Sequence, residues 1–276
     1  MALGSPAVEA LIEHPLQIVG IVLARNEETF VRRAVNNAAA FCDRWILADH
    51  GSRDSTPGIL RELAASMPSA GFHELRDPSE SHRLIQPLAG TNTWVFGVDG
   101  DEIYDPSGLE KFRRRLLSGE FQSHWMILGN VLHCDRLDPG KNEASGFLAP
   151  PSRSITKLYN FSAIDSWEGD TPERLHGGRP VFRRGFHERD KRQLQTEFSW
   201  DASELRCLHA CFVPRSGLDT AGTTRENIME THRGGWMSRI RRLIRQAAGV
   251  PESSGWKRER YRRGPRVTIP TGPFFS

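Results

Sequence analysis

The carboxylates of Asp99, Asp101 and Glu102 follow a short apolar run, and a single glycine, Gly100, separates the two aspartates. Carboxylate oxygens are hard ligands that suit Mg²⁺ or Mn²⁺. A glycine between two aspartates lets the backbone approach a diphosphate closely. An acidic turn is also a common way to end a strand, so this cluster alone does not define a metal site.

Three short apolar runs predict the strands that would position such a site. The runs are too short for helices and read as buried parallel strands, and each ends in a polar cluster. They are residues 17–24 (QIVGIVLA), 44–48 (RWILA) and 93–98 (TWVFGV). Segments with the apolar period of a helix follow the first two runs, at residues 30–38 and 59–65.

This alternation predicts an α/β fold, a mostly parallel sheet flanked by helices. In such sheets ligands bind beyond the carboxyl ends of the strands. The polar clusters at residues 24–28, 49–54 and 99–102 all fall at such ends, so we expect them to converge in space.

The rest of the chain predicts further elements and a separate tail. We expect a catalytic domain over residues 1–216 and a helical or irregular basic extension over 217–276, with a helix near 225–246. Residues 135–154 are rich in glycine and proline and predict a mobile loop. The other expected elements are a short strand at 74–76, helices at 81–89 and 108–117, and strands at 125–133, 157–161 and 204–213.

Composition excludes several classes of protein. A hydrophobic fraction of 38% and a charged fraction of 26% argue against a disordered or fibrous chain. No apolar run approaches the roughly 20 residues that span a bilayer, and the first residues lack the pattern of a secretion signal. Four scattered cysteines do not form a disulfide framework. These features predict a cytoplasmic protein.

Positive charge is concentrated in the tail. Residues 233–266 contain eleven Lys or Arg against Glu252 and Glu259, whereas the net charge of the whole chain is +3. A basic tail attracts phosphate on a nucleotide sugar, a lipid carrier, a membrane or nucleic acid. A lid, a subunit contact that would make a homo-oligomer, and a peripheral membrane contact all stay open. We expect no nucleic-acid partner, because no known nucleic-acid-binding motif accompanies the basic residues.

Three segments together resemble the family 2 glycosyltransferases of the GT-A fold. They are residues 21–35 (IVLARNEETFVRRAV), 46–56 (ILADHGSRDST) and 83–102 (RLIQPLAGTNTWVFGVDGDE). The family shows, in this order, a strand ending in a small residue plus NEE, a strand ending in D-x-G-S-x-D, and an arginine ahead of a DxDE. The resemblance implies a GT-A-like domain that binds a nucleotide-activated sugar.

The resemblance also implies roles for matched residues. Asp49 falls at the aspartate that contacts the nucleotide base, and Arg83 at the basic residue that reaches the base or phosphates. Asp99 falls near the ribose, and Asp101 at the direct metal ligand, at an exposed loop end. Ala24 and Glu27 line the first strand end, where the base packs. Leu84 stands where the family often has asparagine, so Arg76 competes with Arg83 for its role.

A second resemblance identifies a candidate base. Residues 166–175 (SWEGDTPERL) are similar to the W-x-G-x-x-H-E-x-L element of one branch of the family. Glu173 occupies the glutamate position, although Pro172 replaces the histidine. An inverting transferase needs a carboxylate to take the proton of the acceptor hydroxyl. We assign this role to Glu173, with Asp170 and Glu168 as alternatives.

A third resemblance places His209 as the late histidine that completes the metal site in many GT-A enzymes, which implies Mn²⁺ or Mg²⁺ as cofactor. Cys207, His209 and Cys211 also alternate as residues on one face of a strand would, which is an arrangement that zinc accepts. We rank this zinc site below the manganese-type site. For the cysteines, we rank a place in the apolar core above any use of their sulfur as a ligand.

The sequence therefore predicts a metal-dependent inverting glycosyltransferase that uses a nucleoside diphosphate sugar, with UDP-sugars favoured. The acceptor hydroxyl belongs to a glycan, a lipid carrier, a natural product or a protein. The alternative is a protein that binds nucleotide sugars, or acts as a scaffold, without turnover.

Overall fold

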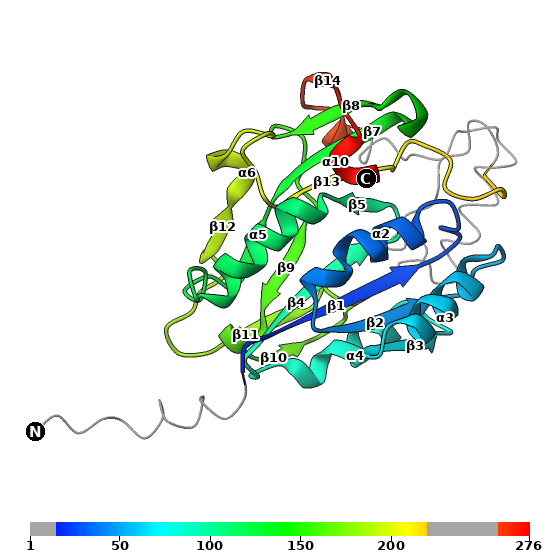
Figure 1. Cartoon of the computed structure of the whole chain (residues 1–276). Helices are drawn as coiled ribbons and strands as arrows, with labels where there is room; N and C mark the ends of the chain where they lie inside the picture. The colour runs from blue at the N-terminus through cyan, green and yellow to red at the C-terminus, as the bar shows by residue number, and fades with distance from the viewer. Residues whose placement is uncertain (1–14, 220–258) are drawn as a thin grey trace, which may run out of the picture.

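A seven-stranded sheet forms the centre of the computed structural model, which describes residues 15–219 and 259–276 (Figure 1). The strand order is β12-β6-β9-β4-β1-β2-β3. Its parallel half consists of β1 (Gln17–Ala24), β2 (Arg44–Asp49), β3 (Ala70–Glu74) and β4 (Thr93–Asp99). The other half contains β9 (Lys157–Asn160), which is antiparallel to β4, and then β6 (Met126–Leu128) and β12 (Lys191–Gln193).

Helices cover both faces of this sheet. On one face lie α2 (Val31–Ala38), α3 (Thr56–Ser66) and α5 (Pro106–Leu117) (Figure 1), and their buried apolar side chains belong to the largest apolar cluster of the described residues. On the other face lie α4 (Glu80–Ile85) and a hairpin of β10 (Ile164–Glu168) and β11 (Arg179–Phe182). The predicted α/β class with a mostly parallel sheet is confirmed.

A second sheet of five strands, in the order β14-β8-β7-β13-β5, adjoins the first. Its strands are β5 (Glu102–Tyr104), β7 (Asn130–Asp138), β8 (Glu143–Ala149), β13 (Arg206–His209) and β14 (Arg266–Ile269). The short helices α6 (Leu194–Glu197) and α10 (Gly272–Phe275) complete the described elements together with 3₁₀ turns at Ala39–Phe41, Gln86–Leu88, Pro139–Lys141 and Phe161–Ala163.

The end of the chain is packed into this second sheet. β14 pairs antiparallel with β8, and Phe274 of α10 is buried in a separate apolar cluster. Nδ2 of Asn37, on α2, donates to the carbonyls of Phe274 and Tyr104, at 2.8 Å each. The expected helix near 225–246 lies outside the described residues, and the division of the chain at residue 216 stays a prediction.

Two sequence-based expectations about secondary structure were wrong. Residues 135–154 contain most of a hairpin, because β7 pairs with β8 across a bulge at Cys134 to Arg136. Glycine and proline are common there because the hairpin turns at Pro139–Lys141, and Asn142 follows with a positive φ. The third strand lies at Ala70–Glu74, several residues earlier than expected, because it is a half-exposed edge strand with a weak apolar signal.

Among the described residues, no helix is long and apolar enough to cross a membrane.

Candidate active site

The carboxyl ends of β1, β2 and β4 meet at one edge of the central sheet. Ala24 is the register partner of Asp49, and Leu23 is the register partner of Asp99. The three polar clusters predicted from the sequence therefore converge, as parallel pairing requires. Beyond Asp99 the chain turns at Gly100 and Asp101 and enters β5, which carries it into the second sheet.

The turn after β4 brings Asp101 to His209. β13 pairs antiparallel with β5, so that His209 lies opposite Glu102, and the amide of Ala210 donates to the carbonyl of Asp101 at 2.9 Å. Oδ2 of Asp101 lies 3.5 Å from Nε2 of His209. Asp101 is only 1% exposed, so the expectation of an exposed loop end was wrong. Pairing of β5 with β13 buries the turn.

Arg215 neutralises the buried carboxylates. Its Nη1 donates to Oδ2 of Asp101 and lies 3.3 Å from Oε1 of Glu27. Burial lowers the pKa of Arg215, but the negative groups of Asp101, Glu27 and Cys211 outweigh it and raise that pKa above its ordinary value. A fixed positive charge therefore stands beside Asp101.

Gly100 packs closely against Glu27 of the first strand end. A Cβ at this position would lie 2.9 Å from both Cβ and Cγ of Glu27 and 3.4 Å from Val31. Its missing side chain therefore makes room for Glu27, whose amide is held by the hydroxyl of Thr56 at 2.8 Å. The predicted approach of a diphosphate to Gly100 stays untested.

Asp99 is held by two cations. Its carboxylate accepts from Nζ of Lys157 at 3.0 Å and contacts Nη2 of Arg174. Arg174 is buried, and its Nη1 also donates to the carbonyls of Ile21 and Val98 at 3.1 and 2.8 Å. Asp99 therefore joins β4 to the segment that contains Glu173.

Asp49 is buried and closes the turn after β2 with three hydrogen bonds. Its Oδ2 accepts from the amides of Gly51 and Ser52 at 3.1 Å each, and its Oδ1 accepts from the hydroxyl of Ser52. Each carboxylate oxygen can accept more than one bond, so a base contact by Asp49 stays a prediction. Ala24 is buried at the end of β1, and Arg83 is exposed on α4.

Glu173 is buried in contact with His176. Oε1 of Glu173 lies against Nδ1 of His176. Burial raises the pKa of Glu173, but His176, Lys157 and His50 outweigh this and hold it at about 2. Glu173 is thus ionised at neutral pH, whereas the alternative Asp170 is exposed in the preceding turn.

Glu102 is a buried carboxyl at the start of β5. Its Oε2 accepts from the amide of Asp99 at 3.1 Å and from the hydroxyl of Tyr104 at 3.2 Å. Burial raises its pKa to about 8, with further contributions from Asp101 and Glu173. Glu102 is therefore largely protonated at neutral pH.

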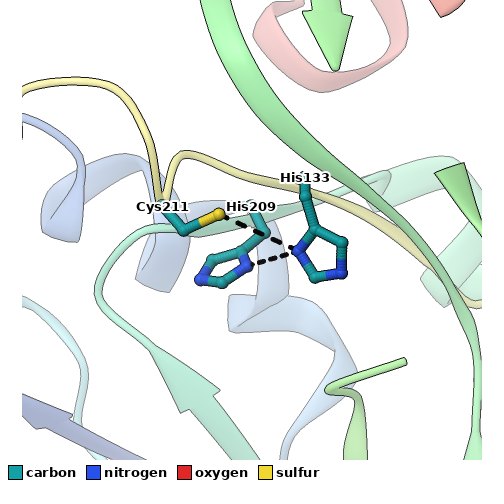
Figure 2. Close-up of side chains that lie close together, drawn as sticks. All are labelled: His133, His209 and Cys211. Carbon is teal, nitrogen blue, oxygen red and sulfur yellow. Dashed lines mark hydrogen bonds between the residues drawn. The ribbon is translucent and has the colours of Figure 1, made fainter. Parts of the chain in front are cut away.

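Figure 2 shows a second group of side chains around His209. Nδ1 of His209 lies 2.9 Å from Nδ1 of His133, on β7, and Sγ of Cys211 lies 3.9 Å from the same His133 atom. The combination of Cys207, His209 and Cys211 weighed from the sequence does not form, because Cys207 is fully buried in the main core.

Sequence reasoning missed four of the residues that shape the site, and it considered His176 only as part of a polar stretch that could bind acceptor or phosphate. Arg215 lies shortly after His209, but nothing in the pattern distinguishes it from exposed neighbours. The other three come from distant strands and segments: Lys157, Arg174 and His133.

Asp101 and His209 have the donor set that a divalent cation of the Mn²⁺ type accepts. An oxygen and a nitrogen 3.5 Å apart can both lie about 2.1 Å from one cation. Arg215 contacts the same Asp101 oxygen, so a bound cation would share that oxygen with a guanidinium. The metal role of the two residues stays a prediction.

No family model matches the chain. Over 147 residues it is 26% identical to an uncharacterized glycosyltransferase of Rickettsia conorii and 24% identical to one of Rickettsia felis. Each match covers 52% of this chain and 48% of the relative, so the chain spans about half the length of the curated relatives it matches. The chain is thus similar to proteins named as glycosyltransferases, while assignment to family 2 stays a prediction.

Two solved structures of glucosyl-3-phosphoglycerate synthase from Mycobacterium tuberculosis show a weaker similarity. One is a complex with Mn²⁺, uridine diphosphate and glucosyl-3-phosphoglycerate, and the other contains Mn²⁺, uridine diphosphate and phosphoglyceric acid. Both are 21% identical to this chain, with TM-scores of 0.30 and 0.31, and cover 42% of it and 44% and 43% of their own chains. A similarity this low assigns no residue a role.

Proposed function

We propose that this chain is a metal-dependent glycosyltransferase that moves a sugar from a nucleoside diphosphate sugar, with UDP-sugars favoured, to an acceptor hydroxyl with inversion. The observation that carries the proposal is the meeting of Asp101, His209 and Arg215 at the carboxyl edge of a mostly parallel sheet. The similarity to proteins named as glycosyltransferases supports it.

The cations at this edge suit a diphosphate. Arg215 stands beside Asp101, and Lys157 stands beside Asp99, so two positive side chains flank the turn after β4. Fixed positive charges stabilise the negative charge that develops on a departing diphosphate. Asp101 and His209 would hold Mn²⁺ or Mg²⁺, and that cation, when bound, offsets further charge on the leaving group.

Glu173 is the proposed base. The acceptor oxygen forms a bond to the anomeric carbon, the bond to the diphosphate breaks, and the acceptor proton passes to Glu173. A carboxylate with a pKa of about 2 is ready to accept a proton but is a weak base, so the transfer must accompany bond formation rather than precede it. Contact with His176 holds the carboxylate in one orientation.

A screen of nucleotide sugars for metal-dependent release of nucleoside diphosphate tests the proposal. We expect release from one donor class with Mn²⁺ present, a loss of release with a chelator, and faster release with a suitable acceptor. Tight binding of nucleotide sugars without any release or transfer would favour the alternative, a binding or scaffolding protein.

A further inference from the structure

We propose that His133, His209 and Cys211 form a binding site for Zn²⁺. The three side chains come from two strands and the turn that follows β13, and each offers one ligand atom within 4.8 Å of the others (Figure 2). Two imidazole nitrogens and a thiolate are ligands that zinc prefers, whereas the harder Mn²⁺ and Mg²⁺ prefer oxygen.

The distances fit a tetrahedral zinc ion after small adjustments. With Zn–N bonds of about 2.05 Å and a Zn–S bond of about 2.3 Å, the two nitrogens would lie about 3.4 Å apart, and nitrogen and sulfur about 3.6 Å apart. The corresponding separations are 2.9 Å between the two Nδ1 atoms and 3.9 Å from Sγ to Nδ1 of His133. Shifts of about half an ångström bring these two pairs into range, and the third pair, Sγ of Cys211 and the ring nitrogen of His209, lies within 4.8 Å.

The second nitrogen of each histidine already faces an acceptor. Nε2 of His133 donates to the carbonyl of Arg153 at 2.8 Å, and Nε2 of His209 faces Oδ2 of Asp101 at 3.5 Å. Zinc-bound histidines almost always donate their other ring N–H to a carbonyl or carboxylate, which fixes the tautomer that places a lone pair on the metal. Because a carbonyl can only accept, neutral His133 carries its proton on Nε2, and its Nδ1 accepts a hydrogen bond from Nδ1 of His209. Zinc binding therefore requires the His209 proton to move from Nδ1 to Nε2, which faces Asp101.

One neighbour fixes the orientation of His133. The ring of Tyr261 stacks on His133 with centroids 4.3 Å apart and an interplanar angle of 1°, which holds the imidazole in its orientation.

The proposed zinc site excludes the manganese-type site because both need His209. A neutral imidazole has one lone pair: when Nδ1 binds zinc, Nε2 carries the proton and points it at Asp101. Zn²⁺ should therefore inhibit the proposed sugar transfer, and this consequence alone rests on the proposed function. Since N and S sites bind Zn²⁺ more tightly than Mn²⁺, excess Mn²⁺ should reverse the inhibition poorly.

Cobalt substitution tests the site without any sugar substrate. The full chain, stripped of metal with a chelator, is titrated with Co²⁺ and then with Zn²⁺. We expect one equivalent of Co²⁺ to give intense tetrahedral absorption and a thiolate-to-cobalt charge-transfer band, both removed by one equivalent of Zn²⁺. A six-coordinate spectrum without thiolate charge transfer would place the metal at Asp101 and His209 and overturn the proposal.

Variants identify the ligands. Cys211→Ser should abolish the charge-transfer band and weaken Zn²⁺ binding by more than the roughly 10–100-fold that loss of an outer partner costs. His133→Gln should weaken binding similarly, with circular dichroism used to check that the variant folds. Cys42→Ala, at a buried cysteine in the main core, is the control and should keep the wild-type spectrum. Unchanged Co²⁺ and Zn²⁺ binding in Cys211→Ser would overturn the proposal.

Discussion

Arg215 donates to Oδ2 of Asp101, the same oxygen that faces His209 at 3.5 Å. The guanidinium thus occupies one side of the oxygen proposed to bind metal, and it also lies 3.3 Å from Glu27. Two buried carboxylates thus share the positive charge of Arg215. A metal ion bound at Asp101 would add to that positive charge.

Arg215→Gln should therefore destabilise the protein, and Mn²⁺ should recover part of the loss. Removal of one partner of a buried ion pair costs about 3–5 kcal/mol in the free energy of unfolding. Urea denaturation with and without Mn²⁺ measures both effects. Arg206→Gln is the matched control, because it breaks the buried pair with Asp105 at 2.8 Å and should show no recovery by Mn²⁺.

Asp101→Asn should reduce metal-dependent turnover by roughly 10²–10³-fold, because it removes the proposed anionic ligand while keeping the side-chain shape. Steady-state release of nucleoside diphosphate against Mn²⁺ concentration gives the measurement. Asp135→Asn removes a half-buried carboxylate that pairs with Arg266 and should leave turnover unchanged. Full activity in Asp101→Asn would remove the metal assignment.

Glu173→Gln should lower kcat by roughly 10²–10⁴-fold and leave the donor Kd nearly unchanged, because the amide cannot accept the proton of the acceptor. Single-turnover kinetics and donor titration separate the two quantities. Asp170→Asn, at the exposed alternative, should behave as wild type. If Asp170→Asn shows the loss instead, the assignment of the base is wrong.

His176→Gln should raise the pKa of Glu173 from about 2, because burial then acts against a weaker set of neighbouring charges. A carboxyl whose pKa is lowered on folding stabilises the protein at pH values above its pKa in the unfolded chain. This stabilisation is lost as the pH falls toward 2. The variant should lose much of that contribution, and the acidic limb of its kcat profile should move to higher pH. An unmoved limb would show that His176 does not set the ionisation of Glu173.

Glu102→Gln should flatten the pH dependence of stability. The pKa of Glu102 is raised to about 8 by burial, so the folded protein holds a proton that the unfolded chain loses near pH 4.5. This group therefore makes stability fall as pH rises between those values, by at most about 1.4 kcal/mol per pH unit. Urea denaturation at several pH values should show a smaller fall in the variant than in wild type.

The apolar runs and polar clusters of the first hundred residues predicted the central sheet because both signals are local. A buried strand needs a continuous apolar run, and parallel strands must end at the same edge, so Asp49 and Asp99 were expected at one edge of the sheet, where they lie on the two strands that flank β1. The approach of Asp101 to His209 agreed with the family pattern.

The cations of the site could not be predicted, because their positions depend on pairings between distant strands. Lys157 reaches Asp99 only because β9 is antiparallel to β4, and no local pattern marks it among 37 lysines and arginines. His133 belongs to β7, whose far half was mistaken for a loop. Burial of Arg174 depends on the carbonyls of Ile21 in β1 and Val98 in β4.

The bond from Asn37 to the carbonyl of Phe274 joins residues 237 positions apart in the chain. During synthesis α2 therefore emerges long before the segment that satisfies its buried amide. Contacts of such sequence separation slow folding, because the loop between them must close before they stabilise anything. The strands of the central sheet end at Gln193, whereas β14 and the ring of Tyr261 follow later in the chain. The surroundings of His133 are therefore complete only after residues 259–276 have been synthesised.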